Sequence, residues 1–256
     1  MRLPLFALLC LFSFAFIPAD TKMLLKKQGR LYEMRVYYAE PGKLDGLVAR
    51  FRNHTTKLFA KHGMANEGYW LPIDNKENKL VYVLSYPNRA AREKSWQAFM
   101  NDADWKKAAA DSEKDGKLIT KIDNFYLKTI DFSPKKIAKK GTANRVFELR
   151  TYKATPGNLP GLLARFRDHT TKLFEKYGMT NLWYWTFTEK EQGADDMLIY
   201  ILSHPSREAG LEAFKKFGAD PAWQAARKAS EVKAGGSLTV SVESLYMVPT
   251  DFSPVK

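Results

Sequence analysis

Cysteine is almost absent from this sequence of 256 residues, which contains Cys10 alone. Cys10 lies in an apolar stretch near the N-terminus, so the rest of the chain has no thiol. Disulfide bonds, thiolate nucleophiles and cysteine metal ligands are therefore excluded from any folded domain that follows this stretch. Stability must come from hydrophobic cores, which a chain of this length can bury.

Histidine and the motifs of cofactor chemistry are also scarce. Two of the four histidines, His62 and His204, are matched by Tyr177 and Tyr86 in the other half of the chain, and no two histidines share metal-ligand spacing on one expected helix in both halves. No G-x-S-x-G, Walker or dinucleotide motif and no haem attachment motif appears. We therefore expect no metal site and no cofactor.

The N-terminal residues have the pattern of a secretory signal peptide. Arg2 gives a short positive start, residues 3–17 are almost entirely apolar, and the small Ala19 precedes the polar Asp20. The apolar stretch is short for a membrane span, which favours cleavage over retention as an anchor. We therefore predict a signal peptide over residues 1–19 and a secreted or periplasmic protein.

The chain is basic, with a formal net charge of +13 from 41 Lys and Arg against 28 Asp and Glu. Such a charge can attract an anionic partner such as nucleic acid or lipid headgroups. The lysines are dispersed, many of them beside acidic residues, and the densest cluster lies within residues 135–144. A solvated surface is the favoured interpretation, with no nucleic acid partner and at most weak contact with an anionic membrane surface.

The sequence occurs in two copies. Arg30–Met64 and Arg145–Met179 are identical at 23 of 35 positions without a gap, and both copies end in Asp-Phe-Ser-Pro. A period of roughly 115 residues corresponds to a whole small domain. We predict domains over residues 30–134 and 145–254, joined by a linker over residues 135–144. Any site should then occur twice or lie at the joint between the copies.

Each copy is expected to run strand, helix, strand, strand, helix, strand, which is the ferredoxin-like order. Helices then cover one face of each sheet, and the other face requires a partner. We predict an α+β fold in which two βαββαβ repeats pack sheet to sheet as an internal pseudo-dimer. The expected strands are 31–38, 69–71, 80–85 and 125–127, then 146–153, 182–187, 197–203 and 245–247; the expected helices are 44–62, 89–100, 159–177 and 207–217.

An ordered set of motifs in both copies resembles the NIPSNAP family. The set comprises a strand with E-x-R-x-Y, a Pro-Gly turn, a helix with R-F-R-x-H-T-T-K-L-F and a closing Gly-Met, followed by S-x-P-x-R and D-F-S-P. The resemblance implies the dimeric α/β-barrel superfamily, here with both halves of the barrel in one chain. Relatives in that superfamily include small monooxygenases, haem-processing enzymes and stress-response proteins, so the resemblance implies the fold more specifically than an activity.

Two histidines occupy equivalent places in the long helices. His54 and His169 each follow a phenylalanine of the apolar stripe, Phe51 or Phe166, by three residues. The helical period therefore predicts both on the buried face. Each is either a core residue with one satisfied hydrogen bond or a general base or ligand contact in a pocket between helix and sheet.

The first strand of each copy carries a glutamate, an arginine and a tyrosine on one face. Such a row costs free energy unless the groups are paired or solvated. It is either an ion pair at the joint between the sheets or a lining that binds an anion or a carbonyl group. Aromatic residues of later strands would fill cores or wall a flat apolar ligand. The candidate ligand-binding residues are Glu33, Arg35, Tyr37, Trp70 and Tyr82 in the first copy and Glu148, Arg150, Tyr152, Trp185 and Tyr200 in the second.

These features predict a binding or interaction module for a small, partly apolar ligand. The first alternative is a cofactor-independent enzyme of the monooxygenase or isomerase kind. It would use His54 or His169 as the base and arginine or tyrosine to stabilise an oxyanion. The second alternative is a purely structural module. Assembly beyond the internal pseudo-dimer is left open.

The mature protein is expected to begin near Asp20, because Ala19 satisfies the small-residue requirement at a signal cleavage site. Intact-mass spectrometry of protein isolated from its native host measures this directly. The expected mass is that of a chain without cysteine. A full-length chain retained in the cytoplasm would contradict the prediction.

Overall fold

The computed structural model describes residues 29–137 and 145–256. The predicted signal peptide and most of the predicted linker lie outside the described residues. The elements of the first repeat are β1 (Leu31–Ala39), α2 (Leu44–Arg50), the π-helical turn η1 (Phe51–Thr55), α3 (Thr56–Lys61), β2 (Ala65–Pro72), β3 (Lys79–Tyr86), α4 (Arg89–Asn101), α5 (Ala103–Glu113) and β4 (Ile119–Thr129).

The second repeat has the same order of elements, with one additional short 3-10 helix. Its elements are β5 (Val146–Ala154), α6 (Leu159–Arg165), the π-helical turn η2 (Phe166–Thr170), α7 (Thr171–Lys176), β6 (Thr180–Phe187), η3 (Lys190–Gln192), β7 (Met197–His204), α8 (Arg207–Ala219), α9 (Pro221–Ala234) and β8 (Thr239–Pro249).

Two features of these elements differ from the sequence prediction. A further helix follows the second predicted one in each repeat, because an aspartate stops one helix and caps the next. Asp102 is extended and accepts a hydrogen bond from the backbone of Asp104, and Asp220 does the same for Ala222 and Trp223. The long helix is also interrupted by a π turn in each repeat, which a helical period of 3.6 residues does not reveal.

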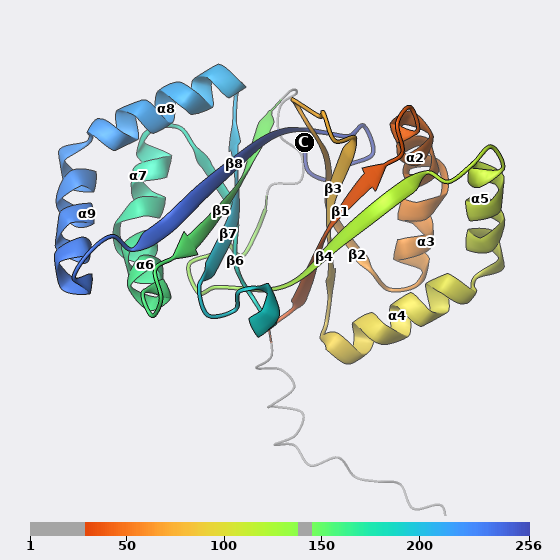
Figure 1. Cartoon of the computed structure of the whole chain (residues 1–256), viewed down its shortest axis with the longest axis horizontal. Helices are drawn as coiled ribbons and strands as arrows, with labels where there is room; N and C mark the ends of the chain where they lie inside the picture. Colours follow the sequence, from red (N-terminus) through yellow and green to blue (C-terminus); the bar gives the residue numbers. More distant parts are fainter. Residues whose placement is uncertain (1–28, 138–144) are drawn as a thin grey trace, which may run out of the picture.

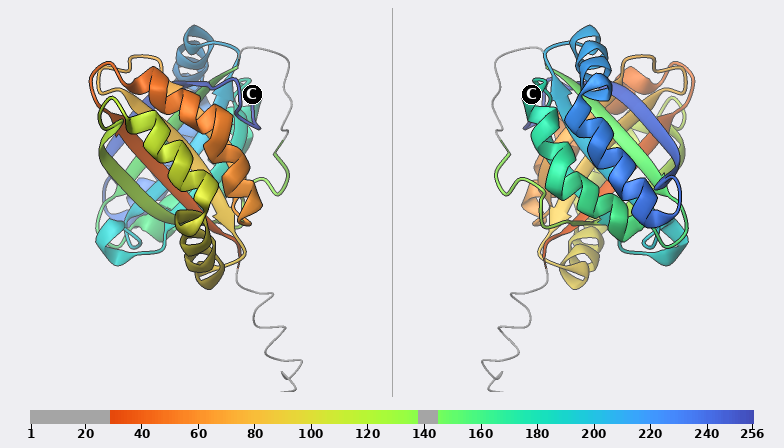
Figure 2. Two further views of the ribbon diagram at one scale, coloured as in Figure 1. Left: turned by 90° about the vertical axis from the view of Figure 1, so that its right-hand side faces the viewer. Right: turned by 90° about the vertical axis from the view of Figure 1, so that its left-hand side faces the viewer.

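The eight strands close into one barrel in the order β1-β3-β2-β8-β5-β7-β6-β4. Within each repeat the order is that of a ferredoxin-like sheet. Antiparallel pairs β2–β8 and β4–β6 join the two sheets edge to edge. The helices lie outside, those of the first repeat on one side and those of the second on the other (Figures 1 and 2). The predicted α+β fold, an internal dimeric α/β barrel, is confirmed.

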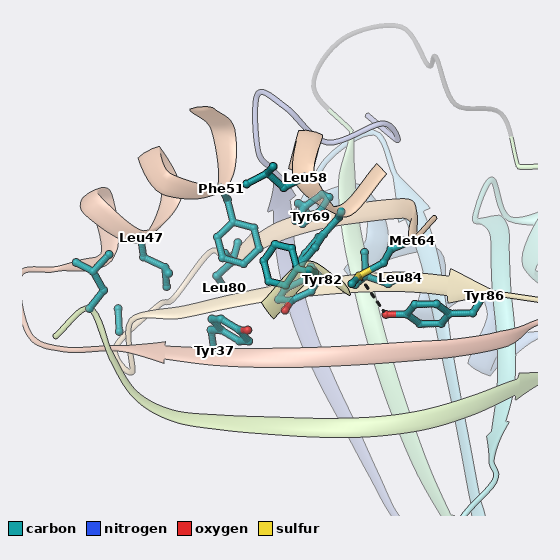
Figure 3. Packing of buried hydrophobic residues seen from close by; sticks show 14 of the residues in the cluster. Tyr37, Leu47, Phe51, Leu58, Met64, Tyr69, Leu80, Tyr82, Leu84 and Tyr86 are labelled. Carbon is teal, nitrogen blue, oxygen red and sulfur yellow. Dashed lines mark hydrogen bonds between the residues drawn. The ribbon is translucent and has the colours of Figure 1, made fainter. Parts of the chain in front are cut away.

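Strand alternation separates two kinds of core. Side chains of one strand face fill the barrel, where they form a cluster contributed by both repeats. Side chains of the other face lie under the helices of their own repeat, as Tyr82 does beneath Leu47 and Phe51 in the first (Figure 3). The barrel core includes Met34, Trp70, Val81, Val83, Phe147, Leu149, Trp183, Trp185, Ile199, Ile201 and Met247.

The segments that end the two repeats are exchanged across the barrel. Asp131 of the first repeat accepts two hydrogen bonds from Arg167, at 2.7 and 2.8 Å, and Asp251 of the second accepts two from Arg52 at the same distances. Phe132 packs into the helix-side core of the second repeat and Phe252 into that of the first. The repeated Asp-Phe-Ser-Pro motif is therefore an inter-repeat fastening.

Over residues 29–137 and 145–256, no helix is both long enough and apolar enough to cross a membrane.

A fragment containing residues 145–256 alone is expected to dimerise or aggregate. It exposes the edges of β6 and β8, which pair with β4 and β2 in the full chain, and it opens half of the barrel core. Light scattering measures the outcome, with the matching fragment 30–137 as a second sample. A soluble monomer of either fragment would contradict the prediction.

Candidate functional site

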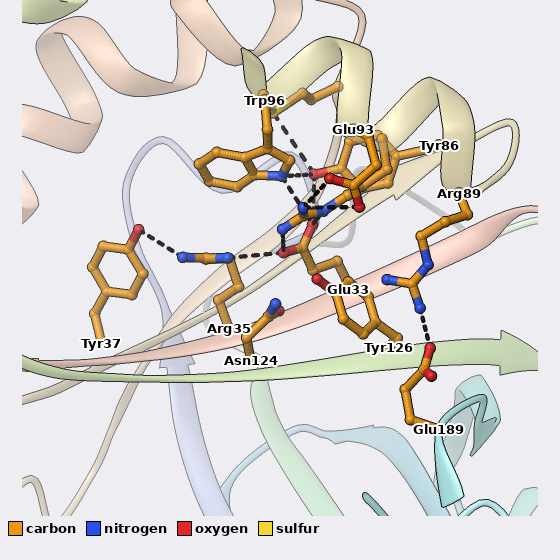
Figure 4. A network of polar contacts seen from close by, with 12 residues as sticks. Glu33, Arg35, Tyr37, Tyr86, Arg89, Glu93, Trp96, Asn124, Tyr126 and Glu189 are labelled. Carbon is orange, nitrogen blue, oxygen red and sulfur yellow. Dashed lines mark hydrogen bonds and ion pairs between the residues drawn. The ribbon is translucent and has the colours of Figure 1, made fainter. Parts of the chain in front are cut away.

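A buried carboxylate lies at the centre of the polar cluster under the first-repeat helices (Figure 4). Glu33 on β1 is 0 % exposed. One of its oxygens accepts from Arg35 and from Arg92, each at 2.8 Å. The other accepts from Tyr86 at 2.8 Å, from Trp96 at 3.0 Å and from Arg92 at 3.1 Å. Every donor thus comes from the same repeat.

The protonation of Glu33 follows from these contacts. Burial is the largest influence and raises its pKa. The hydrogen bonds from Arg92 and the charges of Arg35 and Arg92 together outweigh burial, so the pKa lies below that of an ordinary glutamate. Glu33 is therefore an ionised carboxylate whose two oxygens already accept five hydrogen bonds. It holds β1 against α4 and has no free lone pair for a catalytic proton transfer.

Beside this cluster lies a cavity of about 500 Å³ between the sheet and the helices. It is large enough for a ligand of moderate size. Its walls are mainly aromatic, and its charged groups are three guanidinium groups and Glu113. Met100 and Ile122 are exposed apolar residues of its lining. The principal lining residues are Arg35, Tyr37, Arg50, Phe51, Phe59, Arg92, Trp96, Phe99, Trp105, Ala109 and Glu113.

The π turn η1 borders this cavity. A π turn holds more residues than an α turn, which shifts the helix face that follows it. Phe51 and Thr55 stay on the buried side, and the Thr55 hydroxyl donates to the Arg50 carbonyl at 3.2 Å. Arg50, at the end of α2, is 5 % exposed and lies over the ring of Trp105 at 5.3 Å.

The second repeat keeps the buried carboxylate but surrounds it differently. Glu148 accepts from Arg150 at 2.5 Å and from Ser244 at 2.6 Å, and His204 Nε2 lies 2.8 Å away. Gly210 occupies the position of Arg92. A Cβ atom there would meet the His204 ring at 3.0 Å, so the glycine allows the histidine to approach the helix.

The second-repeat cavity is also smaller, at about 250 Å³. Arg227 takes the position of Ala109, lines this cavity and forms an ion pair with Glu231 at 3.0 Å. A long side chain thus stands where the first repeat has a methyl group. The two repeats share one scaffold, and of the two corresponding cavities between sheet and helices the first is the larger.

The structure corrects the expected position of the E-x-R-x-Y residues. The expected Glu–Arg ion pairs are present, at 2.8 Å for Glu33–Arg35 and 2.5 Å for Glu148–Arg150. Their expected location at the joint between sheets is wrong, because the alternation turns this strand face toward the helices. Arg35 and Tyr37 line the first cavity. In the second cavity Tyr152 has this role, and Arg150 is not part of the lining.

The expected position of His54 and His169 is also wrong. Both are exposed, because the π turns rotate them off the apolar stripe and bury Thr55 and Thr170 instead. His169 borders a space of about 540 Å³ between α6 and α9, and His54 borders one of about 340 Å³ between α3 and α5. Neither lines a cavity between sheet and helices, so neither has the place that a base in that pocket requires.

The predicted aromatic residues fall into two separate environments. Trp70 and Trp185 lie in the barrel core, whereas Tyr82 and Tyr200 lie under the helices of their own repeats. All four are 0 % exposed. The tryptophans are therefore on the opposite sheet face from the cavity and do not join the E-x-R-x-Y residues in one site.

Several lining residues escaped the sequence analysis. Arg92 and Trp96 differ between the repeats, and the search for features present in both copies passed over them, as it did over His204. Arg50 and its equivalent Arg165 were detectable, since a cation adjoins an apolar stripe in both copies. Across the described parts of the chain, no group of three or more His, Cys, Asp or Glu side chains is arranged to hold a metal ion.

Comparison with known proteins agrees with this architecture. The NIPSNAP family model matches residues 32–134 and again residues 147–254. A human relative, Protein NipSnap homolog 3A, is 24 % identical over 229 residues, which cover 89 % of this chain and 87 % of the relative. The likeness therefore extends over both repeats.

Solved structures show the same fold at low sequence identity. A provisionally assigned monooxygenase from Fusobacterium nucleatum matches with a TM-score of 0.58 at 9 % identity, over 87 % of this chain and 93 % of that one. An anthrone oxidase-like protein matches with a TM-score of 0.55 at 14 % identity, over 90 % and 95 %. At such identities the likeness concerns the fold alone.

Replacing Glu33 by glutamine is expected to destabilise the protein by roughly 3–5 kcal/mol at pH 7, because Arg35 and Arg92 lose their buried counter-charge. The folded pKa of Glu33 lies below its ordinary value of 4.5. Its stabilising effect is therefore fully present above that value and is lost as the pH falls through the folded pKa. The difference in unfolding free energy between the wild type and Glu33→Gln should therefore become smaller as the pH falls.

Denaturant titrations at pH 7 and near pH 3 measure both effects. Asp111→Asn is the matched control, since Asp111 pairs with Lys107 on the helix surface, where both side chains are exposed. It should cost less than about 0.5 kcal/mol. Equal losses for the two variants would show that the Glu33 cluster is not a buried ion-pair network.

Proposed function

We propose, from the premise that the chain belongs to the NIPSNAP family, that its first repeat binds a small, partly apolar ligand between sheet and helices. One observation carries the proposal. A cavity of about 500 Å³ combines aromatic walls with three guanidinium groups, whereas its second-repeat equivalent is about half that size. Ligand sites typically have this character, being largely apolar with a few fixed polar groups.

The difference between the repeats supports binding over a purely structural role. Packing alone would favour the filled arrangement, since an unfilled cavity costs stability. In the second repeat Arg227 lines the smaller cavity and pairs with Glu231. The first repeat keeps Ala109 at that position, which leaves the space open. The same scaffold narrows this space in one copy and leaves it about twice as large in the other, which supports a ligand in the larger cavity.

A cofactor-independent enzyme is the second candidate, favoured by the fold shared with proteins described as a monooxygenase and as oxidase-like. Arg35 and Tyr37 would supply the donors that stabilise a developing oxyanion. Such an enzyme would need a base other than His54 and His169. Consumption of dioxygen by the purified protein with a bound acidic aromatic compound would favour this candidate over binding alone.

We propose in addition that the protein acts outside the cytoplasm. The support is the N-terminal pattern of a positive start, an apolar stretch and the small Ala19 before Asp20. Cleavage there would remove Cys10, leaving a chain without thiols in a compartment where thiols oxidise.

The binding proposal is tested with the aromatic fluorescent probe 8-anilinonaphthalene-1-sulfonate. We expect one probe to bind per chain. Ala109→Arg should weaken this binding at least tenfold, since it places in the lining of the first cavity the long side chain that lines the smaller second one. The second repeat carries an arginine at this position, so the fold should tolerate the change, and thermal melting checks this.

Arg227→Ala is the matched control in the other repeat. It should leave first-repeat binding intact, because Arg227 is on α9, which lies on the opposite side of the barrel from α4 and α5 (Figure 1). Probe binding that is unaffected by Ala109→Arg would refute the location proposed here. Binding that both variants abolish equally would also refute it.

A further inference from the structure

Among the cations that line the first cavity, Arg50 has the most unused hydrogen-bonding capacity in the described part of the chain. Arg50 donates through Nη1 to Ser112 at 3.3 Å and to Glu113 at 3.0 Å. In the described part of the chain its Nε has no partner, and Nη2 forms no hydrogen bond. Arginine has five donors, and leaving a buried donor unpaired costs free energy. One edge of the guanidinium group is therefore open.

The other two guanidinium groups of the cavity are already engaged. Arg92 reaches Glu33 through two nitrogens, and Arg35 reaches Glu33 and Tyr37. Among the described residues the Arg35 Nε also has no partner, but Arg35 has a buried carboxylate, that of Glu33, at 2.8 Å. Arg92 shares Glu33 and has Glu93 as a second carboxylate at 3.1 Å. The counter-ion of Arg50 is less complete, because the Glu113 side chain is 36 % exposed and solvated while that of Arg50 is 4 % exposed.

The second repeat has an equivalent buried arginine, Arg165, which in the described part of the chain also has an unused donor. Arg165 is 6 % exposed, and its Nε has no partner among the described residues. It lies 3.7 Å from Glu231, which Arg227 approaches more closely at 3.0 Å. An under-partnered buried arginine is thus built into both copies. The cavity between sheet and helices that it lines is about 500 Å³ in the first copy and about 250 Å³ in the second. Arg165 also lines a separate space of about 540 Å³ between α6 and α9, which the aromatic side chains of the sheet-side cavity do not reach.

We propose that Arg50 binds the carboxylate of a planar aromatic carboxylic acid, an inference that rests on ligand binding in the first-repeat cavity. The adjacent Nε and Nη2 donors match the two oxygens of a carboxylate. A single open edge with Glu113 nearby suits one negative charge, and a dianion such as a phosphate monoester would be repelled by Glu113. The rings of Phe51, Phe59, Trp96, Phe99 and Trp105 enclose the space for the flat body of the ligand.

Calorimetric titration of the full chain with 2-naphthoate and 2-naphthamide tests the proposal, because these compounds share a ring system and differ in charge. The wild type is expected to bind 2-naphthoate about tenfold or more tightly than 2-naphthamide, one molecule per chain. Arg50→Gln should weaken 2-naphthoate binding by about tenfold or more and change 2-naphthamide binding by less than about twofold.

Two further variants keep the test decisive. Arg165→Gln, the matched change in the second repeat, should leave both affinities unchanged. Glu113→Gln should tighten 2-naphthoate binding and not 2-naphthamide binding, because it removes the negative charge beside Arg50. This variant preserves the buried arginine, so it decides the question even where Arg50→Gln fails to fold.

The possible outcomes separate the two proposals. Equal affinity for the two compounds overturns the carboxylate assignment and leaves the cavity as a ligand site. An Arg50→Gln protein that is folded but loses both compounds equally also overturns the assignment, since Arg50 would then shape the cavity. If neither compound nor 8-anilinonaphthalene-1-sulfonate binds the wild type, the proposed function itself fails.

Discussion

Each half of this protein is built around a carboxylate that has no access to water. Glu33 and Glu148 are both 0 % exposed on the strands that begin the repeats. A buried ion costs several kcal/mol unless its partners are close and well oriented, so the surrounding elements have to supply cations and donors. In the first repeat Arg92 and Trp96 of α4 meet this demand together with Arg35 and Tyr86. The network thereby fixes α4 against the sheet.

The two repeats meet the same constraint with different side chains. On α8 the second repeat has Gly210 and Phe214 where α4 of the first has the donors Arg92 and Trp96, and its carboxylate is contacted by His204 instead. It therefore places fewer bulky polar groups beside its cavity, and Arg227 contributes to the smaller space that remains. Duplication has kept the barrel common to both halves and allowed the helix-side spaces to diverge. This divergence is the reason why we expect a ligand to bind in the first cavity and not in the second.

Barrel closure explains why the copies remain in one chain. Each ferredoxin-like sheet has two free edges and an apolar face. Pairing β2 with β8 and β4 with β6 removes the edges, and the same step buries the barrel core. The exchanged Asp-Phe-Ser-Pro segments add forked arginine contacts across the joint. Those contacts are exposed, so their energetic contribution is small, and their geometry mainly fixes the register of one half against the other.

The sequence by itself determined the duplication, the order of the strands, the helices other than α5 and α9, and the internal pseudo-dimer, because strand alternation and repeated motifs are local patterns. It also determined that Glu33 pairs with Arg35, since residues two apart on a strand share a face. Only the tertiary structure decided which face that was, because alternation leaves both orientations open. The π turns likewise moved His54 off the predicted stripe through backbone hydrogen bonding that no residue pattern discloses. The cavity depends on which side chains meet from β1, α2, α4 and α5, so Arg50 and Ala109 acquired their roles only when those distant segments came together.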